Sequence, residues 1–274
     1  MMNINLIRKR YQSHPYHIVD PSPWPIASSF AMLVVMLAAV MYMHGFNYGG
    51  YLLNLGIILI STVMAFWFRD VVVEGTYLGN HTEEVKRGLT IGFALFIVSE
   101  IMAFLSVFWA YFHSSLVPAV EIGGVWPPLG IPVLDPFAIP LLNTILLLSS
   151  GAFITFAHHA IIKGNRRSAI LGTILTLLFA IIFTGLQGYE YSEAGFTIAD
   201  SVYGTVFFAS TGLHGLHVIV GTIFIGVQFV RLLNHHITTT HHVGLESAIA
   251  YWHFVDVVWL FLYAFVYLWS APNL

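Results

Sequence analysis

The sequence has 274 residues, of which 58% are hydrophobic and only 8% are charged, and its formal net charge at pH 7 is −3. A soluble domain carries roughly 25% charged residues, so this composition excludes an ordinary water-soluble protein and indicates a chain embedded in lipid. The sequence contains no cysteine, which excludes disulfides, thiolate metal ligands and a cysteine nucleophile. No basic cluster with interleaved aromatic residues indicates nucleic-acid binding.

Seven apolar runs in the sequence are long enough to cross a bilayer, for which a helix needs about 20 residues. The first run follows the proline-rich string DPSPWP, which suits the start of a helix. The second run is expected to end at Arg69 and Asp70. The runs cover approximately residues 24–42, 51–68, 89–112, 137–157, 169–186, 202–230 and 247–269. The sequence therefore predicts an all-α membrane protein with seven transmembrane helices.

The distribution of charge supports this topology independently. All 10 Lys and Arg residues fall on one side of the seven-helix arrangement, beginning with Arg8, Lys9 and Arg10. Because positively charged loops stay on the inner side of a membrane, we expect the N-terminus inside and the C-terminus outside. Residues 68–88 form the longest polar stretch on the inner side, so we expect a boundary between residues 1–80, with two helices, and residues 81–274, with five. The outer loops carry only acids, namely Glu121, Asp135, Glu190, Glu193 and Asp200.

Glu100 is the only charged residue in the third run. A carboxyl at bilayer depth costs on the order of 2.5–3.5 kcal/mol, and it rarely persists without a role. Helical spacing places Phe93, Phe96 and Phe104 on the same face as Glu100, and these residues offer packing but no counter-ion. We therefore expect a protonated Glu100, either as a structural hydrogen bond to a neighbouring helix or as a functional group.

The 14 histidines invite a metal-binding interpretation. His214 and His217 lie three residues apart in the sixth run, and His253 and Asp256 have the same spacing in the seventh. Membrane di-iron oxygenases use histidine boxes of this kind, so such an enzyme is the main alternative function. The boxes fall at different depths and no carboxylate–histidine pair repeats on another helix, so we expect no bound metal. For His253 and Asp256 we expect a buried polar pair.

Further histidines are clustered on the predicted inner side. An imidazole exchanges protons close to physiological pH, so these residues form a candidate proton-buffering surface; ordinary interfacial histidines are the alternative. They are His158, His159, His235, His236, His241 and His242.

Several strings in the chain closely resemble the cytochrome c oxidase subunit III family, and the similarity extends over nearly the whole chain from Tyr11 onward. The strings are long and specific. They are FIVSE at 96–100, FWAYFHSSL at 108–116, GGVWPPLGI at 123–131, PLLNT at 140–144, AHH at 157–159, YEYSEAGFTIADSVYG at 189–204, TGLHGLHVIVG at 211–221 and YWHFVDVVWLFLY at 251–263.

The resemblance implies a non-catalytic subunit that holds no haem or copper itself, with haem a, haem a3 and copper in partner subunits. It also implies that helices 1–2 and 3–7 form two bundles around a V-shaped, lipid-filled cleft. The main partner is expected to be subunit I, which the chain would stabilise while supporting proton uptake and oxygen access. The implied location is the mitochondrial inner membrane, with the N-terminus in the matrix and the C-terminus in the intermembrane space. Membership of a respiratory supercomplex is left open.

The resemblance also implies roles for single residues. Glu100 stands at the family's carbodiimide-reactive carboxyl, and no residue is expected to be catalytic. Phospholipid head groups are expected beside Trp67, Arg69, Glu74, His81 and Arg231. Arg69 and Arg231 are suitable phosphate binders on physical grounds as well, because a guanidinium forms charge-assisted hydrogen bonds with phosphate oxygens.

Overall fold

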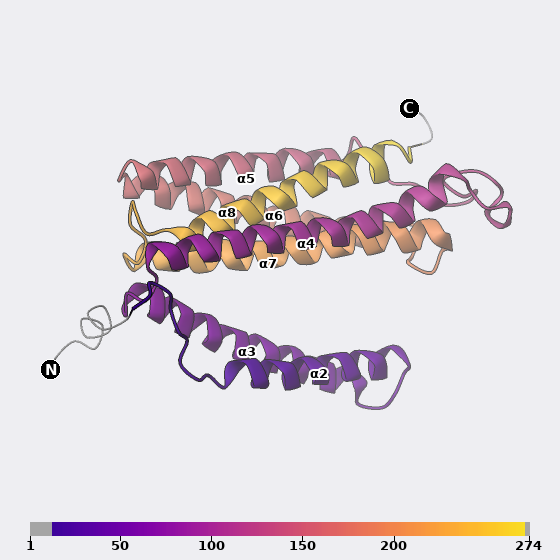
Figure 1. Cartoon of the computed structure of the whole chain (residues 1–274). Coiled ribbons are helices and arrows are strands. Elements are labelled where there is room, and N and C mark those ends of the chain that lie inside the picture. Colours follow the sequence, from indigo (N-terminus) through magenta and orange to yellow (C-terminus); the bar gives the residue numbers. More distant parts are fainter. Residues whose placement is uncertain (1–12, 272–274) are drawn as a thin grey trace. The chain divides into compact units, whose positions relative to one another are not determined.

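The structure, a computed structural model, describes residues 13–271, and within that range the chain is helical without a strand. Arg8, Lys9 and Arg10 therefore lie outside the described residues. Among the described residues, seven helices are long and apolar enough to cross a membrane (Figure 1). They are α2 (Trp24–Met43), α3 (Gly49–Thr76), α4 (Glu83–Leu116), α5 (Ile139–Ile162), α6 (Arg166–Glu193), α7 (Ser201–Leu233) and α8 (Val243–Phe261), which continues as the π-helical segment η2 (Leu262–Leu268). The predicted all-α, seven-helix membrane fold is confirmed.

The helices extend beyond the apolar runs that predicted them. Helix α3 continues to Thr76, past Arg69 and Asp70, where the apolar run was expected to end. Glu190 and Glu193, expected in a loop, belong to the last turns of α6. Charged residues end the apolar segment, but they do not end the helix, because backbone hydrogen bonds continue into the polar region beyond the lipid.

The chain divides into two compact units, residues 1–89 and 90–274. Helices α2 and α3 belong to the first unit, and α4 begins there and continues into the second. The expected boundary after residue 80 and the lipid-filled cleft stay predictions.

Small residues bring α2 and α3 together in the first unit. The buried positions of the two helices are Ala31, Ala38, Gly49 and Gly56. A Cβ atom added at Gly56 would lie 3.0 Å from Val35 Cγ2, so glycine allows the backbones to approach. Close packing of small residues is how transmembrane helices associate when no hydrophobic driving force acts between them.

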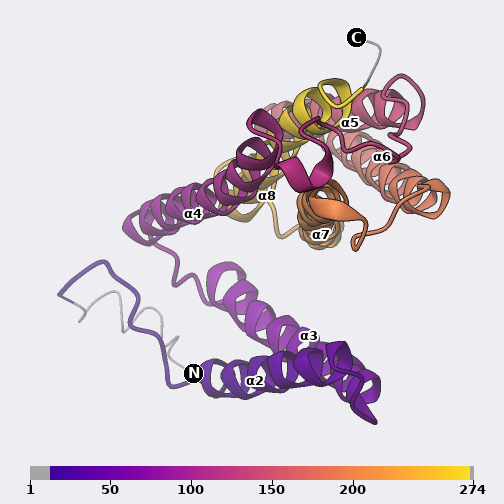
Figure 2. The same cartoon turned by 90° about the vertical axis from the view of Figure 1, so that its right-hand side faces the viewer.

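Helix α8 is the centre of the second unit, with α4, α5 and α7 around it (Figure 2). Trp252 and Trp259 are fully buried on α8. Their indole N–H groups donate to Ser150 Oγ and Thr144 Oγ1 of α5, both at 2.9 Å. Each tryptophan thus combines a large buried ring with a satisfied polar atom, and the pair fixes α8 against α5.

Helix α4 packs against its neighbours through long aromatic side chains. The ring centroids of Phe104 and Phe254 are 5.8 Å apart, and those of Phe93 and Phe224 are 6.1 Å apart. Tyr111 donates its hydroxyl proton to the carbonyl of Phe265 at 2.6 Å. Because Phe93 and Phe104 lie on the face predicted for Glu100, this packing directs Glu100 toward the bundle.

Candidate functional site

Glu100 lies against His217 of α7. The distance from Glu100 Oε2 to His217 Nε2 is 2.8 Å, and the two side chains are 23% and 9% exposed. The His217 ring also makes an edge contact with Phe104 and stacks on Tyr251. The acid of α4 therefore has a partner, and it comes from a different helix.

The second nitrogen of His217 determines the charge of this pair. His217 Nδ1 lies 2.8 Å from the carbonyl oxygen of Leu213, and a carbonyl only accepts hydrogen bonds, so Nδ1 carries a proton. The contact with Glu100 then needs one further proton, on either Nε2 or Oε2. In both arrangements the pair as a whole has no net charge, which is the state that a low-dielectric environment favours.

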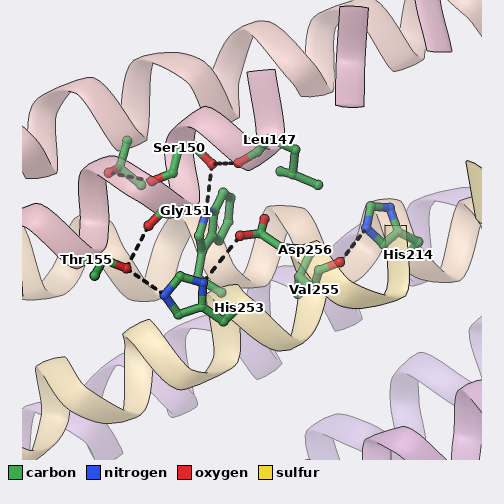
Figure 3. Close-up of polar contacts among 10 residues, drawn as sticks. Leu147, Ser150, Gly151, Thr155, His214, His253, Val255 and Asp256 are labelled. Carbon is green, nitrogen blue, oxygen red and sulfur yellow. Dashed lines mark hydrogen bonds and ion pairs between the residues drawn. The ribbon is translucent and has the colours of Figure 1, made fainter. Parts of the chain in front are cut away.

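His253 and Asp256 also lie close together, on α8 (Figure 3). His253 Nδ1 is 3.5 Å from Asp256 Oδ2. His253 Nε2 is 2.9 Å from Thr155 Oγ1, and that hydroxyl donates to the carbonyl of Gly151 at 2.9 Å, so Nε2 is the donor to Thr155. The predicted polar pair thus connects α8 to α5.

Asp256 is inserted against the backbone of α5 at Gly151 (Figure 3). A Cβ atom added at Gly151 would lie well under 3.0 Å from Asp256 Oδ2. Asp256 Oδ1 is buried and has no hydrogen-bond partner within residues 13–271. Glycine at position 151 is therefore what makes room for the carboxyl.

The histidine boxes do not converge on one centre. His214 Nε2 donates to the carbonyl of Val255 at 3.2 Å, whereas His217 Nε2 faces Glu100. Contacts between helices thus use both boxes, the one with His214 and His217 and the one with His253 and Asp256. This argues against a di-iron oxygenase, in which the histidines converge on one metal centre.

Four of the five residues expected at lipid head groups lie in the first unit. Arg69 bonds Asp70 through Nε and Nη2, and its guanidinium lies over the Phe66 ring. Glu74 Oε2 lies 4.0 Å from His17 Nδ1, and these two residues and His81 place their ligand atoms within 4.8 Å of one another. The four residues are Trp67, Arg69, Glu74 and His81, all on α3 or directly after it.

Arg231, the fifth expected residue, belongs to the second unit and stands in the last turn of α7. Its Nη1 donates to Gln228 Oε1 at 3.1 Å. Its Nε is buried without a hydrogen-bond partner in the described part of the chain.

The basic residues of the second unit gather at one end, where α5 and α7 finish and α6 and α8 begin. This basic end carries Lys163, Arg166, Arg167 and Arg231. Arg166, at the start of α6, bonds the end of α7 and the segment after it. Its Nη1 lies 2.7 Å from His235 Nδ1, and its Nη2 donates to the carbonyl of Leu233 at 2.9 Å. Since a guanidinium only donates, His235 Nδ1 accepts, and this geometry requires a neutral imidazole.

The six histidines of the candidate buffering surface are not one cluster. The rings of His159 and His242 both lie beside His158, with centroids 6.1 and 5.5 Å from it. His235 instead bonds Arg166, and His241 donates its backbone N–H to Thr238 in the connection before α8. His236 lies in the same connection between α7 and α8. Proton buffering by these residues stays a prediction.

The sequence analysis missed two acids that the structure makes prominent. Glu246 lies 3.1 Å from His242 Nε2, one helical turn along α8, and the i,i+4 spacing was a usable signal. Glu190 is only 2% exposed, and its Oε1 accepts hydrogen bonds from Tyr267 at 2.6 Å and from Gln187 at 3.3 Å. No local pattern distinguishes Glu190 from a loop acid, because Tyr267 is far along the chain.

Comparison with known proteins gives one consistent result. The family model described as "Cytochrome c oxidase subunit III" matches residues 14–271. A protein of Mycosarcoma maydis named "Cytochrome c oxidase subunit 3" is 58% identical over 98% of this chain and 100% of its own length. Proteins of the same name from Neurospora crassa and Prototheca wickerhamii are each 56% identical, over 97% and 95% of this chain and 99% of their own lengths.

Proposed function

Because the chain belongs to the cytochrome c oxidase subunit III family, we propose that it is a core subunit of the oxidase that holds no redox centre and stabilises the catalytic subunit I. Haem a, haem a3 and copper belong to the partner subunits. The chain lies in the mitochondrial inner membrane, with its N-terminus in the matrix and its C-terminus in the intermembrane space. The distribution of Lys and Arg along the sequence supports this orientation.

The observation that carries the proposal is the hydrogen bond between Glu100 and His217. The carboxyl is bonded to His217 in a pair without net charge, between aromatic rings of α4 and α8. Such a pair joins helices and needs no exchange with pumped protons. We assign Glu100 a structural role. The subunit as a whole supports proton uptake and oxygen access by keeping subunit I and its lipid surroundings in place.

Replacing Glu100 by Gln is the direct test of this role. The Gln amide retains a donor for His217 Nε2, so the interhelical hydrogen bond survives while the titratable proton is lost. We expect the assembled oxidase carrying Glu100→Gln to retain most of its proton pumping, measured as protons released per electron in oxidase vesicles. Glu121→Gln, in the loop before α5, is the matched control. Pumping below half of the control value would contradict a structural role for Glu100.

We also propose that the chain binds phospholipid head groups through Trp67, Arg69, Glu74, His81 and Arg231. Arg231 supports this role for the second unit, because its guanidinium stands in the last turn of α7 at the basic end, where it can donate charge-assisted hydrogen bonds to phosphate. Arg69 is exposed near the end of α3 and supports it for the first unit.

Replacing Arg231 by Gln removes the charge and the orphaned donor. We expect the purified oxidase to lose about one tightly bound phospholipid per complex, measured by quantitative lipid mass spectrometry after detergent exchange. Arg167→Gln is the control, because Arg167 is an exposed cation in the first turn of α6 at the same end of the unit. An unchanged lipid content in the Arg231 variant would contradict the assignment.

A further inference from the structure

A group of three metal-ligand side chains lies at the basic end of the second unit. His158 comes from the last turns of α5, His242 directly precedes α8, and Glu246 lies in the first turn of α8. Their ligand atoms all lie within 4.8 Å of one another. Glu246 Oε1 is 3.1 Å from His242 Nε2 and 4.0 Å from His158 Nε2.

The hydrogen bonds around His242 leave a lone pair directed at Glu246. His242 Nδ1 lies 3.0 Å from the carbonyl oxygen of Thr238, which only accepts, so Nδ1 carries the proton of the neutral ring. In that tautomer Nε2 and the Glu246 carboxylate are two acceptors in contact, and either a proton or a bound metal ion between them satisfies both. A backbone carbonyl that accepts from the other ring nitrogen is also the usual second-shell partner of a metal-bound histidine.

His158 supplies a third donor atom. Its Nε2 is buried and has no hydrogen-bond partner among the residues that the structure describes. An orphaned ring nitrogen 4.0 Å from the Glu246 oxygen is a group that a bound cation would satisfy. Two imidazole nitrogens and one carboxylate oxygen are a donor set suited to Zn²⁺, and three protein ligands leave a fourth position for water.

We propose that His158, His242 and Glu246 form a zinc-binding site that joins the end of α5 to the start of α8. At Zn–N and Zn–O distances of about 2.0–2.2 Å, tetrahedral ligands lie about 3.3 Å apart. The His242–Glu246 distance of 3.1 Å already satisfies this spacing, and His158 Nε2, which is 4.0 Å from the same oxygen, has to move about 0.7 Å closer to it. Glu246 is exposed, so the ion has access from the aqueous side.

Zinc titration of the purified oxidase tests the site. The complex is first treated with a chelator, and exchangeable zinc is then measured by equilibrium dialysis against ZnCl₂ with radioactive zinc. We expect one exchangeable zinc per complex to be lost, or its dissociation constant to rise at least about tenfold, in His242→Ala and in Glu246→Gln. His159→Ala is the control and should bind as the unaltered complex does, because His159 is the adjacent histidine and is not among the three grouped residues.

A second measurement uses the unaltered complex, so it does not depend on whether the variants assemble. Crystals of the oxidase exposed to ZnCl₂ should show an anomalous peak at the zinc edge within about 2.2 Å of His158 Nε2, His242 Nε2 and Glu246. A peak between the three side chains supports the proposal. Absence of a peak there at saturating zinc, or unchanged binding in both ligand variants, would overturn it.

Discussion

Replacing His217 with Leu is expected to lower the free energy of unfolding of the chain by about 2 kcal/mol. The substitution removes the partner of Glu100 and leaves a polar group that is mostly withdrawn from solvent without its hydrogen bond. It also removes ring contacts with Phe104 and Tyr251. The change is measurable by SDS titration of the full chain in mixed micelles, followed by tryptophan fluorescence.

A double variant separates loss of the bond from loss of packing. When Glu100 and His217 are both replaced by Leu, no polar atom remains unsatisfied, and we expect most of the lost stability to return. If the double variant is instead less stable than His217→Leu alone, the pair does not carry the interaction between α4 and α7.

Replacing Gly151 with Ala is expected to be more disruptive still, costing about 3 kcal/mol. The new Cβ would clash with Asp256 Oδ2, which lies against the α5 backbone. The carboxyl has little freedom to move, because Asp256 is buried and its neighbour Trp252 is fixed to Ser150. Relief of the clash therefore requires α5 and α8 to separate.

Gly185 provides the matched control for this prediction. It is also a helical glycine, but a Cβ atom added there would meet nothing within 4 Å. We expect Gly185→Ala to change the stability by less than about 1 kcal/mol, since only helix propensity is altered. Both variants are compared by the same SDS titration and by the amount of assembled oxidase in membranes. Equal stability of the two variants would show that the Asp256 carboxyl does not need the space that glycine leaves at position 151.

The positions of the helices followed from local sequence. A transmembrane helix satisfies its own backbone hydrogen bonds, and lipid selects any apolar run of sufficient length, so neither step requires distant contacts. Helix α2 accordingly spans Trp24–Met43, where the apolar run predicted residues 24–42. The family was also correctly identified from strings of the sequence alone. Helix ends were less well predicted, as α3 shows, because they lie where hydropathy no longer discriminates.

The partners of the polar residues were decided by tertiary structure. Helical periodicity identified the face of α4 that carries Glu100 and Phe104, but not His217, which is 117 positions away. Glu246 was within local reach of His242, yet His158 comes from another helix. Which apolar segment enters the membrane depends on its own transfer free energy. Which polar atoms meet inside depends on how helices from distant parts of the chain pack, and no local pattern encodes that arrangement.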